Sequence, residues 1–156
     1  MKYIILAVAI ALAIFYFTRN SLNKKLAVEN VAIGKHFLVK NKANDGVVET
    51  ASGLQYQILQ KGEGNEHPST SSNVKVHYHG SLLDGTVFDS SVERGKPISF
   101  TLKQVISGWT EGVQLMVVGD KFKFFIPSEL GYGDRSTGKI TSGSLLIFEV
   151  ELLDIQ

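Results

Sequence analysis

The 156-residue chain contains no cysteine, only three prolines and almost no excess of charge. Without cysteine it has no disulfides, no thiolate nucleophile and no thiolate metal ligand, and its composition suits an oxidising and a reducing compartment equally well. Its formal net charge of +1 is unlike the strongly basic footprint of a nucleic-acid-binding protein, so no nucleic-acid partner is expected. The length is sufficient for one ordinary domain with a hydrophobic core and an appendage.

Histidines are too few and too scattered to predict a metal site. His77 and His79 would share one face of a strand, but a catalytic zinc site needs at least three protein ligands. The other two, His36 and His67, lie in a predicted stalk helix and a polar loop. We therefore expect solvated histidines and no metal.

Phosphate binding and nucleophilic catalysis have no clear signal either. The ELGYGD segment lacks the glycine-rich turn into a helix that cradles phosphate. Ser90 and Ser91 lie near Asp89 in the sequence, but no histidine is expected on the inward face to serve as their base.

The strongest feature that is present is an apolar run, YIILAVAIALAIFYF, over residues 3–17. Its length falls between that of a secretory signal and that of a full membrane span. Small residues at Ala11 and Ala13 provide cleavage spacing, whereas the aromatic end of the run is typical of a membrane interface. We favour an uncleaved signal anchor over residues 1–18, with a cleaved signal peptide as the alternative, and we expect membrane contact through residues 3–17.

Composition changes after this run. Residues 19–45 contain one glycine, no proline and six basic against two acidic residues, whereas residues 46–156 contain fourteen glycines and all three prolines. This contrast predicts a basic stalk over residues 19–45 and a globular domain over residues 46–156. Within the stalk, four apolar residues recur at helical spacing and NKANDG supplies a stop signal; they are Leu22, Leu26, Ile33 and Phe37. This apolar face would pack on the domain or pair with another chain.

The domain has the patterns of antiparallel β-structure. In VKVHYHG, Val74, Val76 and Tyr78 alternate with polar residues, as in a strand with one wet face. Asp84-Gly85 is a strong hairpin signal. Further strands are predicted at LQYQILQ, PISFTL, KFKFFIP and SLLIFEVELL, and helical spacing in KQVISGWTEGVQLM predicts one short helix against the sheet, which makes the class α+β.

Several polar residues are expected beside a large aromatic set, as in a small-ligand or peptide pocket. The polar residues are Tyr78, Asp89, Arg94 and Tyr132, and the aromatic ones are Phe88, Phe100, Trp109, Phe124 and Phe148. Phe100 and Phe124 are expected in the core. Trp109 starts the short helix after a glycine, and Tyr132 lies between two glycines, which favours a role in the pocket for both.

Three strings carry a resemblance to a known family: VKVHYHGSLLDGTVFDSSVERGKPISFTL, VISGWTEGVQLMVVGDKFKFFIPSELGYG and LLIFEVELL. In this order and spacing, residues 54–154 resemble FKBP-type peptidyl-prolyl cis-trans isomerases. VVETASGLQYQIL resembles the lead-in of the bacterial branch, where an N-terminal extension, often a dimerising helical region behind a signal sequence, precedes the catalytic domain. The stalk is shorter than that region. A homodimer is therefore possible, but the sequence does not support it.

The resemblance implies an antiparallel sheet of five or six strands curled around one short helix, with the site between them. It implies no cofactor, and it implies proline-containing polypeptides and macrolides such as rapamycin as partners. Trp109 would form the floor under the substrate proline, while the Ile106 backbone N–H and the Tyr132 hydroxyl would hold substrate carbonyls. The implied catalytic residues are Tyr78, Phe88, Asp89, Trp109, Tyr132 and Phe148, and the implied substrate-binding residues are Arg94, Ile98, Val105, Ile106 and Ile140.

Two positions depart from the family pattern. Ile98 stands where many members have phenylalanine, which changes one wall of the pocket. The segment GDRSTGKITSGS, residues 133–144, lacks the prolines common before the last strand, which predicts a more mobile flap.

The expected activity is therefore faster rotation of X-Pro bonds in folding or exported proteins, and the alternative is a chaperone or proline-peptide-binding module of the same fold with little catalysis. Asp89 is expected to stay ionised, paired with Arg94 and bonded to Tyr78, rather than to act as an acid or base. Family habit favours a domain in the periplasm, either anchored in a bacterial inner membrane or released after cleavage. The charges flanking the apolar run leave a cytoplasm-facing orientation open.

Overall fold

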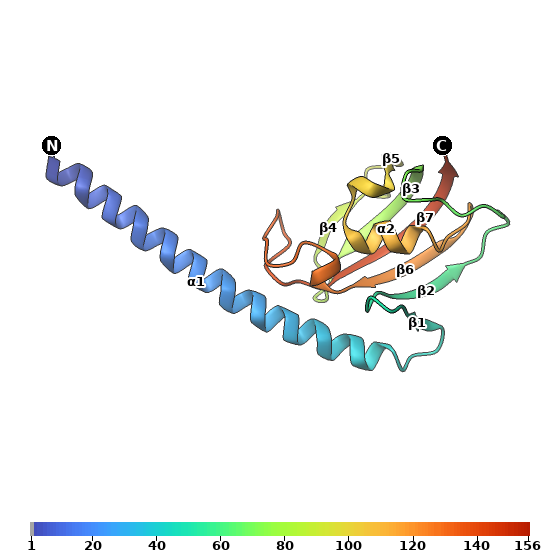
Figure 1. The fold of residues 1–156 in the computed structure, drawn as a ribbon, viewed down its shortest axis with the longest axis horizontal. Helices are drawn as coiled ribbons and strands as arrows, with labels where there is room; N and C mark the ends of the chain where they lie inside the picture. The colour runs from blue at the N-terminus through green and yellow to red at the C-terminus, as the bar shows by residue number, and fades with distance from the viewer. Residues whose placement is uncertain (1) are drawn as a thin grey trace.

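The computed structural model describes residues 2–156, with side chains from Ile4 onward. Met1 and the side chains of Lys2 and Tyr3, which belong to the predicted signal segment, lie outside this description. A long helix leads into a curved sheet with one short helix against it, and Figure 1 shows the long helix projecting far beyond the sheet. The elements are α1 (Lys2–Asn41), β1 (Val47–Glu49), β2 (Gln55–Gln60), β3 (Asn73–Ser81), β4 (Val87–Ser90), β5 (Ile98–Thr101), η1 (Leu102–Gln104), α2 (Ser107–Val113), β6 (Lys121–Ile126), η2 (Ser128–Leu130) and β7 (Leu146–Ile155).

All strand pairs in the sheet are antiparallel. The order is β1-β2-β6-β7-β3-β4, and β5 also pairs with β3. The α+β class is confirmed, and the sheet has seven strands where five or six were expected. The additional strand, β1, pairs with β2 over only three residues, which is too short to produce an alternating pattern.

One edge of β3 is shared by two strands, and this arrangement shapes the site. Ile98 of β5 pairs with Val76, whereas Ser90 of β4 pairs with His79 farther along the same edge. Residues 91–97 leave the sheet between β4 and β5. A short loop with polar residues therefore starts and ends at the same edge of the sheet.

The predicted alternation and hairpin are both confirmed. Val74, Val76 and Tyr78 are buried, as are the alternate residues of β7 from Leu146 to Leu152. The hairpin turn closes through a hydrogen bond from the Leu82 N–H to the Thr86 carbonyl at 2.9 Å.

The short helix α2 lies very close to the sheet because two glycines face it. A Cβ at Gly108 would lie 2.6 Å from Cγ2 of Ile126, and one at Gly112 would lie 2.6 Å from Cε1 of Phe124. Neither position has room for a larger residue without a shift of the helix. This close approach places Trp109, in the first turn of α2, against the core.

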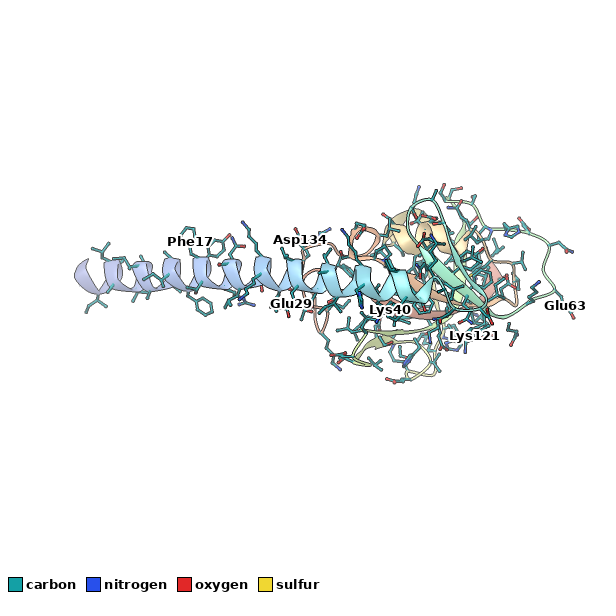
Figure 2. All side chains as sticks on the ribbon, turned by 90° about the horizontal axis from the view of Figure 1, so that it is seen from below. Phe17, Glu29, Lys40, Glu63, Lys121 and Asp134 are labelled. Carbon is teal, nitrogen blue, oxygen red and sulfur yellow. The ribbon has the colours of Figure 1, made fainter. Side chains whose placement is uncertain are left out.

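Helix α1 is continuous through the predicted boundary at residue 18 and ends at the predicted stop signal. Its side chains from Ile4 to Leu22 are all exposed, and its length and composition would allow it to cross a membrane. Figure 2 shows Phe17 on the projecting part and Lys40 where the helix lies along the domain.

The part of α1 that contacts the domain uses a face that overlaps only partly with the predicted one. Leu22, Leu26 and Ile33 are 60%, 42% and 51% exposed, although Ile33 lines a small cavity between the helix and the domain. Phe37 packs on the domain, against Phe125 at 5.7 Å between ring centroids. The contact face consists mainly of small and polar residues, because the helix runs close to a loop backbone. Its members are Ala27, Asn30, Gly34, Phe37 and Asn41.

Candidate functional site

A cavity of about 510 Å³ opens between α2, the strands β3 to β5 and the loop before β7. Ten of the eleven predicted site residues line it, and the eleventh, Arg94, contacts two of them. Sequence reasoning missed Gln104, Thr137, Gly138 and Lys139 and assigned Phe100 to the core alone. The complete lining is Tyr78, Phe88, Asp89, Ile98, Phe100, Gln104, Val105, Ile106, Trp109, Tyr132, Thr137, Gly138, Lys139, Ile140 and Phe148.

The floor of the cavity is an aromatic cluster centred on Trp109, which is only 5% exposed. Tyr78 and Phe148 meet its indole edge to face, with centroids 5.3 and 5.1 Å away, and Phe100 lies 5.2 Å away. Such perpendicular arrangements are favourable for aromatic quadrupoles. Three neighbours from different elements thus fix the indole.

A glycine makes room for the next aromatic pair. Phe88 packs on Phe148 with centroids 5.2 Å apart, and both rings extend over Gly80 of β3. A Cβ at Gly80 would lie 2.7 Å from each ring, so this position sets how deeply both rings can sit.

Three polar groups form one edge of the cavity in the arrangement that the sequence predicts. The Tyr78 hydroxyl donates to Oδ2 of Asp89 at 2.5 Å, Arg94 Nη1 donates to Oδ1 of Asp89, and Arg94 Nη2 donates to the Tyr78 oxygen at 3.1 Å. Arg94 arrives from the loop over residues 91–97, so the shared edge of β3 brings the three groups together.

The charges of these groups follow from their contacts. Partial burial alone would raise the pKa of Asp89, but hydrogen bonds from Tyr78 and Arg94, with the Arg94 charge, lower this pKa below its ordinary value of 3.8. Burial, followed by the bond to Asp89, raises the pKa of Tyr78 above 10.0. At neutral pH Asp89 is therefore ionised and Tyr78 protonated, so the edge of the cavity is a polar wall with a fixed charge.

Two further groups on the cavity wall are open hydrogen-bond donors. The backbone N–H of Ile106, just before α2, and the hydroxyl of Tyr132 have no hydrogen-bond partner among residues 2–156. A bound polypeptide offers carbonyl oxygens that match both donors.

Within the segment 133–144, residues 134–144 are called the flap from here on, and their tip forms the wall opposite the strands. The tip is a tight turn in which Thr137 and Ile140 exchange two backbone hydrogen bonds of 2.9 Å. Ile140 is 5% exposed and belongs to the core, and Lys139 Nζ donates to the Val87 carbonyl at 3.3 Å. Although the flap lacks prolines, its tip has defined contacts on two sides.

A second cavity, of about 570 Å³, continues past Ile106 and Tyr132. It shares five lining residues with the first cavity and adds Ser107, Arg135 and Ser136, among others. The two cavities together provide space for residues on either side of a bound side chain.

The two strand histidines are half-buried, and each has a serine hydroxyl within hydrogen-bond distance. His77 Nδ1 lies 2.9 Å from Ser91 Oγ, and His79 Nδ1 lies 3.0 Å from Ser90 Oγ. They occupy the face of β3 opposite Tyr78, outside the cavity. No group of three or more potential metal-ligating side chains occurs in the described part of the chain.

An aromatic cavity with an ionised edge and two open donors has the make-up of a site for a small ligand or a short apolar stretch of polypeptide. Comparisons with known proteins agree with a site of this class. Residues 64–153 match the family described as FKBP-type peptidyl-prolyl cis-trans isomerase, and residues 9–58 match the domain amino terminal to it. The chain belongs to the FKBP-type peptidyl-prolyl cis-trans isomerase family.

Individual relatives support this assignment. The chain is 55% identical over 132 residues to the FKBP-type isomerase FkpA of Aeromonas hydrophila, covering 85% of this chain and 49% of the relative. It is 47% identical over 135 residues to the outer membrane protein MIP of Legionella longbeachae, covering 86% and 57%. The crystal structure of FkpA from Escherichia coli superposes with a TM-score of 0.92 at 40% identity, covering 98% of this chain and 71% of that one. The chain thus spans about half the length of the curated relatives it matches.

Proposed function

We propose that this chain is a peptidyl-prolyl cis-trans isomerase that acts on X-Pro bonds of folding or exported polypeptides. The observation that carries the proposal is the aromatic cavity over Trp109 with open donors at Ile106 and Tyr132 on its wall. Members of this family bind proline-containing peptides. The second candidate is a chaperone or binding module with little catalysis. The second cavity supports it, because the added space would hold more of a bound polypeptide.

The reaction needs no covalent intermediate. Rotation about an amide bond has a barrier of about 18–20 kcal/mol because it interrupts resonance, and X-Pro bonds isomerise unaided in tens to hundreds of seconds. A site that binds the twisted amide better than either planar form lowers this barrier by about 1.4 kcal/mol per tenfold in rate. Because a twisted amide is less polar, a dry aromatic cavity favours it over the planar amide in water.

Each wall has a role in this proposal. Trp109 is the floor under the proline ring, and Phe88 and Phe148 close its sides. The Ile106 N–H and the Tyr132 hydroxyl hold the neighbouring carbonyls, so the flanking chain is fixed while the amide turns. The other walls are formed by the polar edge of Tyr78, Asp89 and Arg94 and by the apolar side chains of Ile98, Val105 and Ile140.

A proline-peptide isomerisation assay on the full chain in detergent micelles tests the activity. Wild type should accelerate isomerisation, and Trp109→Phe should lower kcat/KM about tenfold, or about 1.4 kcal/mol. This change removes no hydrogen bond, because the buried indole N–H has no partner among the described residues. Trp109→Ala should reduce activity further, with about 3–5 kcal/mol of lost stability. Binding of unfolded protein without any acceleration would favour the chaperone alternative.

The same cavity should bind macrolides such as rapamycin, for which the family is a known receptor class. Calorimetry on the wild type and on Trp109→Phe measures this directly. A folded wild-type chain that binds no macrolide would contradict the transfer of the family pocket to this protein.

We also propose three functional parts: a signal anchor over residues 1–18, a stalk over 19–45 and the isomerase domain over 46–156. The exposed apolar side chains of α1 from Ile4 onward support membrane attachment, and a signal sequence would have the same properties. The proposed location is the periplasmic face of a bacterial inner membrane, which protease accessibility in spheroplasts tests.

A homodimer could form through the exposed side chains of Leu22, Leu26 and Ile33. Light scattering in detergent would test this by measuring the mass of the particle.

A further inference from the structure

The flap is attached to helix α1 from outside the cavity. Asn30 Nδ2 donates to the Ser142 carbonyl at 2.7 Å and to Thr141 Oγ1 at 3.1 Å. Both hydrogens of one amide group are thus used on the flap.

Close packing accompanies these hydrogen bonds. A Cβ at Gly143 would lie 2.8 Å from the Cα of Ala27, and one at Gly34 would lie 3.2 Å from Cβ of Leu145. Ala27 is only 5% exposed. The helix and the flap base therefore meet almost backbone to backbone, and the residues at the contact leave no space for larger side chains.

Inside the flap, Ser142 connects this contact to the cavity wall. Its N–H donates to Ser136 Oγ at 3.1 Å, and its hydroxyl donates to the Asp134 carbonyl. These bonds close the base of the loop, whose tip, Thr137 to Ile140, lines the cavity. A displacement at Ser142 would therefore reach the tip through a short bonded path.

We propose that Asn30 is a positioning residue for the isomerase site: through Ser142 it holds the flap in the conformation that forms the cavity wall. The proposal rests on the proposed function, and it assigns a role in substrate binding to a helix that contributes no lining residue. The side-chain bonds from α1 hold the loop where prolines would otherwise stiffen it. The helix contact thereby sets the affinity of the pocket for its substrate.

The test compares the full-length wild type in detergent with Asn30→Ala and Asn30→Asp. Asn30→Asp keeps the shape but replaces both donors with an anion facing the Ser142 carbonyl. Each variant should exchange amide hydrogens about tenfold faster across residues 134–144, and the Kd for a proline peptide should rise about three- to tenfold while kcat changes less than about twofold. Asn20→Ala, an exposed asparagine on the same helix, is the matched control and should leave all values unchanged.

A glycine pair provides an independent check. Gly143→Ala places a methyl group against Ala27, whereas Gly133→Ala has the same kind of positive φ but open space around its Cβ. Both substitutions should strain the backbone to a similar extent. Only Gly143→Ala should also weaken peptide binding, because only this methyl group disturbs the contact with α1.

Three results would overturn the proposal: unchanged flap exchange in both Asn30 variants, faster exchange with unaltered peptide affinity, or equal acceleration of exchange in β7, which would indicate general destabilisation. An inactive wild type would instead contradict the proposed function. Flap exchange and the peptide Kd would still decide whether Asn30 positions the flap.

Discussion

The two walls of the cavity are held in different ways. The wall formed by Tyr78, Phe88 and Asp89 belongs to β3 and β4, so backbone pairing within the sheet fixes it. The flap wall has one isolated pair, Thr137 with Ile140, and a backbone hydrogen bond at its base from the Gly143 N–H to the Gly133 carbonyl. Beyond these it depends on side-chain bonds and on helix α1. Changes in the strand wall should therefore alter both folding and activity, whereas changes in the flap wall should alter mainly binding.

Among changes in the two walls, the largest effect is expected from Gly80→Ala in the strand wall. The new methyl group would lie 2.7 Å from both Phe88 and Phe148, and since the paired strand cannot yield, the rings must move. Such overpacking costs about 1–3 kcal/mol of stability, and we expect kcat/KM to fall about tenfold with it. Thermal unfolding and the isomerisation assay measure the two effects. Lys75→Ala on the outer face of β3 is the control; full activity in Gly80→Ala would show that this wall is less rigid than proposed.

A smaller effect is expected from Asp89→Asn. The Asp89 and Arg94 side chains are 44% and 51% exposed, and ion pairs this exposed contribute about 0.2–1 kcal/mol. We therefore expect kcat/KM to fall less than about fivefold, with the same pH profile as wild type between pH 5 and 8. A large loss that follows a titration curve would instead identify Asp89 as a general base.

The same pair predicts how the strand wall responds to acid. The pKa of Asp89 is lower in the folded state than its ordinary 3.8, so its contribution to stability is complete above that value and is lost as the pH falls through the folded-state pKa. Because the pair forms one edge of the cavity, peptide affinity should follow the charge of Asp89. It should be constant from pH 8 to about 5 and decline only below about 4. In Asp89→Asn this decline should be weaker, which titrations by calorimetry can establish; an identical decline in both proteins would assign it to another group.

The smallest effect is expected from Lys139→Ala at the flap tip. Its bond to the Val87 carbonyl is 3.3 Å long and exposed, so peptide affinity should change less than about twofold and thermal stability not measurably. Lys103→Ala, outside the cavity, is the matched control. A strong loss of affinity would mean that the flap is held across the cavity mouth rather than from α1.

The strand wall was predictable from the sequence, and most of the flap wall was not. Alternation fixed the inward side of Tyr78 and Phe148, and the family strings identified Asp89, Trp109 and Tyr132 together. Gln104, Thr137 and Lys139 carry no such signal, because Gln104 lies at the end of the short η1 and the other two lie in a loop, and neither segment is long enough to show a periodicity. Phe100 shows a different limit, since one ring both packs in the core and lines the cavity.

The contact face of α1 was missed for a physical reason. Hydrophobic periodicity selects Leu22, Leu26 and Ile33, yet all three stay exposed, and only Ile33 reaches the edge of the contact with the domain. Where a helix lies directly on a loop backbone, only small residues fit, and loop carbonyls require donors. Ala27 and Asn30 meet these needs, but such residues do not stand out in a hydrophobicity pattern.

The unbroken course of α1 has a consequence for where the domain can lie. With the apolar run in a membrane, as proposed, the helix rises only about 14 Å before Ala27 meets the domain. A flexible linker would let the domain explore a wide volume, whereas a continuous helix of this length would keep the cavity close to the membrane surface. The effective concentration of the cavity is thereby raised for polypeptides that lie along or emerge from the same membrane, and lowered for those that diffuse farther away.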